Sequence, residues 1–183
     1  MNLDEIKRIR QQAACLASPA EVEHAITRLA ARITAALEEA NPLVFTVMNG
    51  GLIFAGRLLA KLDFPLEASY LHATRYGEHT QGQQLHWRAR PDSPLNGRTV
   101  LILDDILDEG HTLLAIQQYL KNAGASRVLS AVLVHKQHER KASPGLRADF
   151  TGLELADRFL FGCGMDYKGY WRNAPGIYAI PNA

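Results

Sequence analysis

The amino-acid sequence predicts an α/β protein with a parallel sheet flanked by helices, and three observations lead to that class. Apolar segments of strand length alternate with segments of helical spacing between residues 43 and 135. The strand candidates are almost continuously apolar, as strands covered on both faces of a sheet are. The chain of 183 residues, 47% hydrophobic and 21% charged, is long enough for one domain with an ordinary core.

Residues 1–40 are predicted to be helical. A capping box at Ser18 and Glu21, with Pro19 in the first helical position, predicts that a helix begins there. Its apolar stripe continues to Leu37, and Asn41-Pro42 ends it. An earlier helix is predicted from apolar residues at helical spacing, which are Leu3, Ile6, Ile9, Ala13 and Leu16.

The alternating part of the chain follows. We predict strands and helices, in chain order, at Leu43–Met48 (strand), 52–62 (helix), Leu66–Ala73 (strand), Thr99–Leu103 (strand), Thr112–Asn122 (helix) and Arg127–His135 (strand). Later strand candidates are Asp149–Leu155, Phe159–Phe161 and Ile177–Ile180. Ligands bind beyond the carboxyl ends of the strands in such sheets, so the residues after Met48, Leu103 and His135 are the first site candidates. Residues 74–97 carry no clear pattern, and so long a stretch predicts a lid or binding loop.

Composition excludes several classes of function. The formal net charge of +1 gives no reason to expect a polyanionic partner. The two cysteines, Cys15 and Cys163, lie far apart and form neither a disulfide framework nor a CxxC site. No apolar run approaches the length of a membrane span, and the N-terminus lacks the pattern of a signal peptide. We therefore expect a soluble, cytoplasmic protein without a membrane partner.

The strongest local signal is the segment from Val100 to Thr112. An apolar strand ends in Asp104 and Asp105, passes Asp108, and turns through Gly110 into a helix. Free amides at a helix start bind anions, and a glycine there lets the anion come close. Carboxylates beside an anion site fit a ligand that also carries hydroxyls or a cation, and a sugar phosphate with magnesium supplies both. Asp108, at the junction, could take or give a proton.

Acidic residues at this spacing also occur in unrelated settings. An isolated acidic pair is most often a helix cap or a solvated loop, but a pair between a buried strand and a glycine turn is not isolated. The pattern G-x-x-x-x-G-K-[ST] of a Walker phosphate loop is absent. The spacing DDxxD is found in the aspartate-rich magnesium sites of isoprenoid synthases. Those sites lie on helices, whereas the residues before Asp104 are typical of a strand.

Residues 100–112 resemble the phosphoribosyl-pyrophosphate signature of type I phosphoribosyltransferases. With its flanks, the chain resembles hypoxanthine-guanine phosphoribosyltransferases over nearly all of residues 40–180. The resemblance implies a single domain over residues 1–183 with a core at about 40–140. It further implies a small hood from the N-terminal helices and about 150–183, and a lid loop at about 74–97. It also implies a Mg²⁺ cofactor and a homodimer or homotetramer.

The resemblance assigns one group of residues to phosphoribosyl pyrophosphate. Asn49 and Gly50 match the pyrophosphate loop, Arg172 matches an arginine that closes over the pyrophosphate, and Tyr76 matches a tyrosine of the mobile loop. The 5′-phosphate would be bound by the backbone amides of four residues and by the hydroxyl of Thr112. The four residues are Glu109, Gly110, His111 and Thr112. Asp104 and Asp105 hold the ribose hydroxyls. Magnesium would be held by Asp104, Asp105 and Asp166, with some of these contacts made through the substrate and through water.

A second group is assigned to the purine. Lys136 matches a lysine that donates to the 6-oxygen of the base, and a lysine donates only, so it favours a 6-oxopurine over a 6-aminopurine. Phe159 would stack on the ring, the Leu160 backbone would bind its edge, and Asp166 would lie near the 2-position. The resemblance makes Asp108 the general base for the N7 proton.

The chain departs from the family pattern at several positions. Asn49 stands where lysine is common, Arg75 where serine is common, and Asp104 where glutamate is commoner. Glu109 replaces threonine or serine, and His111 replaces a frequent lysine. Because the side chain of Glu109 carries the same charge as a phosphate, only its amide is expected to serve the ligand.

The resemblance implies a magnesium-dependent transferase that joins hypoxanthine or guanine to phosphoribosyl pyrophosphate. One alternative is a regulator on the same fold that binds nucleic acid through Lys136, Arg140, Lys141 and Arg147. Another is a transferase for a different base, such as xanthine or a pyrimidine. A metal pair at His135 and His138 is not favoured, since no further ligand lies nearby in sequence. The recurrence of His72, His79 and His86 is interpreted as coincidence.

Overall fold

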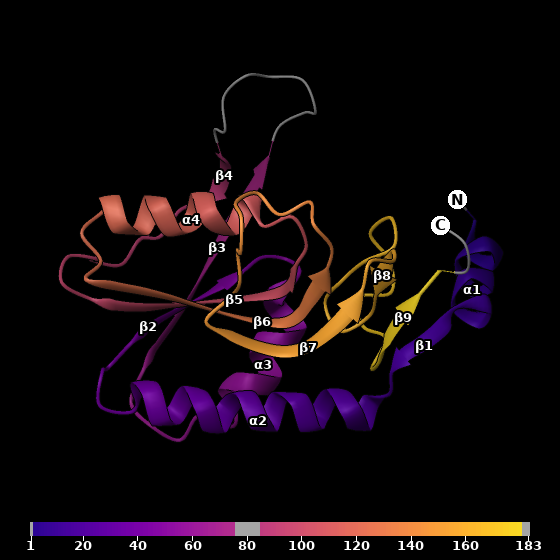
Figure 1. Ribbon diagram of the computed structural model, residues 1–183, viewed down its shortest axis with the longest axis horizontal. Helices are drawn as coiled ribbons and strands as arrows, with labels where there is room; N and C mark the ends of the chain where they lie inside the picture. The colour runs from indigo at the N-terminus through magenta and orange to yellow at the C-terminus, as the bar shows by residue number, and fades with distance from the viewer. Residues whose placement is uncertain (1, 76–84, 181–183) are drawn as a thin grey trace.

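A six-stranded sheet forms the body of the protein in a computed structural model, which describes residues 2–75 and 85–180 (Figure 1). Neighbouring strands are parallel, except that β4 is antiparallel to β3. In spatial order the strands are β4 (Leu85–Ala89), β3 (Glu67–Arg75), β2 (Leu43–Val47), β5 (Thr99–Leu107), β6 (Arg127–Gln137) and β7 (Phe150–Ala156). The predicted parallel α/β class is confirmed.

Helices cover both faces of this sheet. The helices α2 (Pro19–Leu37) and α3 (Gly51–Leu59) lie on one face, and α4 (His111–Asn122) lies on the other (Figure 1). The central strands alternate between the two hydrophobic cores, with Leu101 packed toward α2 and α3 and Ile102 packed toward α4. Both side chains are fully buried. This two-sided burial explains why these strands are continuously apolar.

The predicted start of α2 is also confirmed. The Ser18 hydroxyl accepts the Glu21 backbone N–H at 3.3 Å, and the Glu21 carboxylate accepts the Ser18 backbone N–H at 2.8 Å. This reciprocal pair satisfies two of the amides that a helix start leaves without partners.

A small hood stands at one end of the main sheet, and the two chain termini form it (Figure 1). It contains α1 (Leu3–Gln12) and a three-stranded sheet in the order β1-β9-β8. The strands are β1 (Ala14–Ala17), β8 (Leu160–Phe161) and β9 (Ile177–Ala179). The Trp171 indole N–H donates to the Ile6 carbonyl at 2.8 Å and joins the C-terminal turns to α1. The expected hood of terminal segments is therefore present.

Two elements differ from the sequence prediction. The expected helix through Leu16 ends at Gln12, because Ala14–Ala17 pair with Ile177–Ala179 from the other end of the chain. The segment 74–97, expected to lack regular structure, contains β4, which pairs with β3. Residues 76–84, and with them Tyr76, lie outside the described residues, so the lid stays a prediction. Among the described residues, no helix is both long and apolar enough to span a membrane.

Candidate active site

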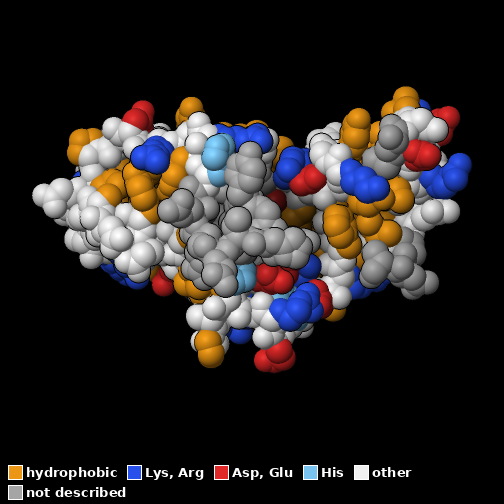
Figure 2. Space-filling model, turned by 90° about the horizontal axis from the view of Figure 1, so that it is seen from above, with side chains coloured by type: hydrophobic (Ala, Val, Ile, Leu, Met, Phe, Trp, Pro, Cys, Tyr) orange, Lys and Arg blue, Asp and Glu red, His pale blue; other side chains and the backbone are white. Residues whose placement is uncertain are grey.

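A cavity of about 530 Å³ lies at the carboxyl ends of the central strands. Figure 2 shows acidic, basic and histidine side chains gathered between the larger body and the hood. The lining residues come from β2 and the loop after it, β3 to β6, and the hood, and they include Asn49, Gly50, Asp104, Asp105, Asp108, Lys136, Phe159, Leu160, Asp166 and Arg172. Thus ten predicted site residues, separated by more than a hundred positions in sequence, line one cavity.

Asp104 and Asp105 lie within β5 and not after it, which corrects the predicted end of the strand at Leu103. The strand continues because its pairing with β6 extends as far as Leu107 opposite His135. The Asp105 backbone N–H donates to Asp104 Oδ1 at 3.0 Å, and Asp105 is 7% exposed. Burial and the charge of Asp105 raise the pKa of Asp104 well above its usual value. Burial also raises the pKa of Asp105, so this pair lacks enough partners for its charge.

The residues after β5 form the predicted phosphate turn. Gly110 has φ +88°, and α4 begins directly after it at His111. The first helical hydrogen bond runs from the Leu114 N–H to the Gly110 carbonyl, so the amides just before Leu114 precede the helical ladder. A second cavity of about 300 Å³, lined by the consecutive residues 104–113, lies over them. The carboxylate of Glu109 lies 3.5 Å from Nε2 of His111.

The loop after β2 forms another wall of the main cavity. A methyl group on Gly50 would lie 2.7 Å from Cγ of Asp105, so only glycine allows this close approach. The peptide bond between Met48 and Asn49 is cis. The hood approaches this loop at Gly164, where any side chain would collide with the Gly50 carbonyl oxygen.

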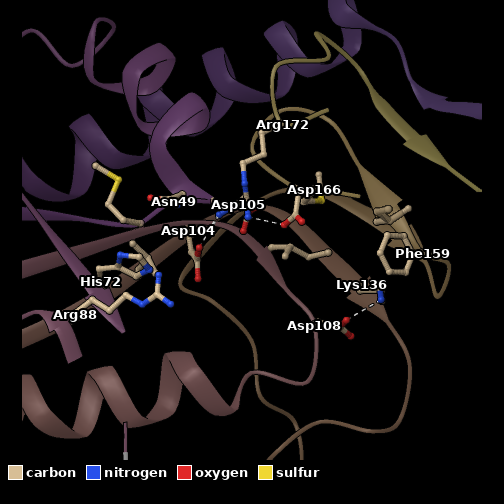
Figure 3. Close-up of a pocket in the computed structure, with 16 residues that line it drawn as sticks. Asn49, His72, Arg88, Asp104, Asp105, Asp108, Lys136, Phe159, Asp166 and Arg172 are labelled. Carbon is tan, nitrogen blue, oxygen red and sulfur yellow. Dashed lines mark hydrogen bonds and ion pairs between the residues drawn. The ribbon is translucent and has the colours of Figure 1, made fainter. Parts of the chain in front are cut away.

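Arg172 and Asp166 reach the cavity from the hood. The Arg172 guanidinium lies 2.5 Å from Asp166 Oδ1 and donates to the Gly164 carbonyl at 2.6 Å. The second oxygen of Asp166 accepts the Gly169 N–H at 2.6 Å. In Figure 3, Arg172 and Asp166 lie beside Asp105 in the middle of the cavity.

Asp108 and Lys136 meet at one end of the cavity, near Phe159 (Figure 3). Lys136 lies within β6, although the sequence places it just after a strand, and it is 9% exposed. Its ammonium lies 2.7 Å from Asp108 Oδ2, and His138 Nε2 lies 2.7 Å from Oδ1. Burial alone would raise the pKa of Asp108, but the hydrogen bonds from Lys136 and His138 outweigh it, and the pKa is lowered.

Phe159 and Leu160 complete this end of the cavity. Phe159 is 44% exposed and meets Tyr167 edge to face, with ring centroids 5.8 Å apart. An aromatic ring this exposed, next to a lysine donor, is suited to stack on a planar ligand. Leu160 is buried at the start of β8 and also lines the cavity.

Sequence reasoning missed His72 and Arg88, which lie at the opposite end of the cavity (Figure 3). Ala73 pairs with Trp87 but His72 pairs with Ala89, so Arg88 is the extra residue of a β-bulge. Bulges often redirect a side chain toward a site. The alternation in Leu85–Ala89 would have revealed β4, but the bulge leaves no sequence signal.

His138 enters the sequence prediction only as half of an unfavoured metal pair with His135. Within the described ranges 2–75 and 85–180, the one group of acidic and histidine side chains close enough for a shared ion is Asp108, His138 and Asp157. Lys136 contacts Asp108, and Arg140 contacts Asp157 at 2.7 Å. Because cationic side chains already neutralise both carboxylates, we do not assign a metal to this group.

A glycine turn precedes a helix, two carboxylates lie on the preceding strand and a lysine lies on the next strand, which is the arrangement expected of an α/β protein that binds a phosphorylated sugar. A family model described as phosphoribosyl transferase domain matches residues 15–168, and the chain belongs to that family. The expected family is confirmed. Catalysis in this family generally involves a metal ion.

The curated relatives agree with this assignment. The chain is 31% identical over 169 residues to a hypoxanthine-guanine phosphoribosyltransferase of Bacillus subtilis, covering 92% of this chain and 93% of that protein. It is 28% identical to an Aquifex aeolicus protein of the same name, covering 87% of this chain and 90% of the relative.

Among solved structures, a hypoxanthine-guanine-xanthine phosphoribosyltransferase superposes with a TM-score of 0.83 at 27% identity, covering 92% of this chain and 97% of the other. A hypoxanthine phosphoribosyltransferase from Staphylococcus aureus superposes with a TM-score of 0.88, covering 98% of this chain and 97% of that chain. At 22% identity it supports the fold alone.

The phosphate turn generates a test by stability. Gly110→Ala should lower the free energy of unfolding by about 2–4 kcal/mol, because the residue needs a positive φ and its new methyl group would contact Leu107 and Leu146. Gly97 also has a positive φ, +73°, but open space around it, so Gly97→Ala should cost about 1 kcal/mol. Urea unfolding measures both values. Equal losses would contradict the tight packing of the turn.

Proposed function

We propose that the protein transfers the phosphoribosyl group of phosphoribosyl pyrophosphate to hypoxanthine or guanine, forming IMP or GMP and releasing pyrophosphate. One observation carries the proposal. The phosphate turn after β5 and Lys136 on β6 open into neighbouring parts of one cleft, with Asp108 contacting Lys136 between them. A nucleoside monophosphate has its phosphate at one end and its base at the other. The turn after β5 would bind the phosphate, and Lys136 would bind the base. The named relatives support the same reaction.

The sugar-phosphate end is built from backbone groups and carboxylates. The amides of residues 109–112 and the Thr112 hydroxyl hold the 5′-phosphate. Asp104 and Asp105 accept hydrogen bonds from the ribose hydroxyls, which supplies partners for their buried charge. The backbone at Asn49 and Gly50 binds the pyrophosphate, and Arg172 adds positive charge from the hood.

The donor set fits the proposed Mg²⁺ cofactor. Asp104 and Asp105 offer hard oxygen ligands, and burial raises the pKa of both, so a cation beside them would favour their charged forms. Asp166, whose carboxylate pairs with Arg172, would reach the ion through substrate and water. When bound, the ion would neutralise negative charge on the diphosphate and so make it a better leaving group.

Base selection rests on Lys136. Its ammonium donates to the 6-oxygen of the purine, and it cannot accept from a 6-amino group. Phe159 stacks on the ring, the Leu160 backbone binds the edge, and Asp166 lies toward the 2-position. Asp108 takes the proton from N7 as N9 bonds to C1′ of the ribose. The bond from C1′ to the pyrophosphate oxygen breaks, and its electron pair leaves with the pyrophosphate.

The alternative of a nucleic-acid-binding regulator loses its basis. Its four basic residues do not form a free basic face. Lys136 is paired with Asp108, Arg140 with Asp157, and Arg147 with Glu154. The ammonium of Lys141 donates to three main-chain carbonyls. The cytoplasmic location and the homodimer or homotetramer remain predictions, and sedimentation would measure the latter.

The reaction itself is the first test. The protein should form nucleotide from phosphoribosyl pyrophosphate with hypoxanthine or guanine, and a metal chelator should stop it. Adenine should react more than about a hundredfold more slowly, since its amino group leaves Lys136 without an acceptor. Chromatography of the nucleotides measures all bases, including xanthine, in parallel. Lack of turnover with every purine would refute the proposal, and a preference for adenine would refute the role of Lys136.

Asp108 provides the second test. Asp108→Asn keeps the shape of the side chain but cannot accept the N7 proton, so kcat should fall by about 10²–10⁴-fold. Affinity for phosphoribosyl pyrophosphate, measured by calorimetry with magnesium, should change little. Glu154→Gln is the matched control, because Glu154 is an acidic residue on β7 outside this cavity. Unchanged turnover in Asp108→Asn would remove Asp108 from the mechanism.

A further inference from the structure

The two carboxylate oxygens of Asp108 have different hydrogen-bond donors. Oδ2 faces the Lys136 ammonium and Oδ1 faces His138 Nε2, each at 2.7 Å. The His138 side chain is only 4% exposed, whereas the Asp108 side chain is 45% exposed. The buried histidine therefore contacts a carboxylate that is itself exposed to the cavity.

The hydrogen bond at the second ring nitrogen fixes the tautomer of a neutral His138 ring. Its Nδ1 accepts the backbone N–H of Arg140 at 3.0 Å. An Nδ1 that accepts a hydrogen bond carries no hydrogen, so a neutral imidazole here carries its hydrogen on Nε2. Nε2–H then donates to Asp108 Oδ1. Each polar atom of the ring has one partner, and the main chain at Arg140 fixes the direction of the donor.

In the proposed reaction, Lys136 and His138 respond differently when the purine binds. When a 6-oxopurine binds, Lys136 donates to its 6-oxygen and releases Oδ2 of Asp108. Among the described residues, the His138 ring bonds the Asp108 carboxylate and the Arg140 N–H and does not line the cavity, so its hydrogen bond to Oδ1 is expected to remain. We infer that His138 is a positioning residue for Asp108. Its Nε2–H holds Oδ1 and leaves Oδ2 free to take the N7 proton. This role rests on the proposed function.

Other charged groups face this cluster without contacting the carboxylate of Asp108. Asp157, which follows β7, lies 3.6 Å from the Lys136 ammonium and pairs with Arg140. Lys141 donates to the Asp108 main-chain carbonyl at 2.5 Å. Glu109 follows Asp108 directly and lies near His111. Among the described residues, therefore, Lys136 and His138 are the side chains that donate to this carboxylate.

The inference is tested with one variant that removes the donor and one that keeps it. His138→Leu fills similar space without an N–H, and His138→Gln retains a side-chain N–H. Gln137→Ala is the control, because Gln137 is exposed and bonds Glu154, away from Asp108. The rates kcat and kcat/KM for hypoxanthine are measured across the pH range at saturating phosphoribosyl pyrophosphate and magnesium.

His138→Leu should lower kcat roughly tenfold and move the acid limb of the kcat profile to higher pH. The direction follows because a lost donor leaves the carboxylate less stabilised, which raises the pKa of Asp108. The shift should be larger in kcat than in kcat/KM, since Lys136 still supports Asp108 in the free enzyme. His138→Gln and Gln137→Ala should keep the wild-type profile, and the KM for phosphoribosyl pyrophosphate should be unchanged in all variants.

A structural role predicts a different result. If His138→Leu only lowers the melting temperature and keeps the wild-type acid limb, the inference is overturned. Equal losses in the leucine and glutamine variants, with no shift of the limb, also overturn it. Failure of the proposed function shows earlier, as absence of turnover in the wild-type protein. Carbon-13 NMR of the unliganded protein gives a readout that does not depend on activity. The pH at which the Asp108 carboxyl group is half-titrated should rise in His138→Leu and stay at the wild-type value in His138→Gln and Gln137→Ala.

Discussion

The parallel pairing of β5 with β6 is the constraint on which the rest of the site depends. The register that sets Leu107 opposite His135 brings the ends of both strands to the same edge of the sheet. Asp108 on one strand end then meets Lys136 on the other at 2.7 Å. Lys141 fastens the two ends by donating to the main-chain carbonyls of Leu107, Asp108 and Lys136. One pair of strands thus places both the turn proposed to bind phosphate and the lysine proposed to recognise the base.

The charged side chains of the cavity differ in how well the protein itself neutralises them. Burial disfavours the charged forms of Asp104 and Asp105, and in the proposed complex the ribose hydroxyls and the metal ion would supply their missing partners. Lys136 and Arg172, by contrast, are already paired with Asp108 and Asp166. The net charge of +1 for the whole chain therefore does not reveal that one cleft holds both ion pairs and the two buried carboxylates Asp104 and Asp105.

Sequence reasoning found what depends on local pattern. The apolar strand β2, the start of α2 at Ser18 and the turn at Gly110 all carry signals within a few residues. It missed β1 and β4, since β1 is determined by pairing with distant residues 177–179 and β4 by a bulged hairpin. Arg88 and His138 were missed for a related reason. Arg88 lines the cavity at a bulge in the pairing of β4 with β3, and His138 contacts Asp108, which lies 30 positions away in the sequence. Neither relation can be seen in a single sequence.

We infer that the strand pair β5 and β6 holds both ends of a purine nucleotide, with Asp108 between them. A crystal structure of the complex with IMP and magnesium tests it most directly. We expect the phosphate to lie on the amides of residues 109–112 and the Lys136 ammonium on the 6-oxygen, with Asp108 Oδ2 facing N7 while Oδ1 stays on His138. A complex in which Lys136 still contacts Asp108 while the base lies elsewhere would contradict it.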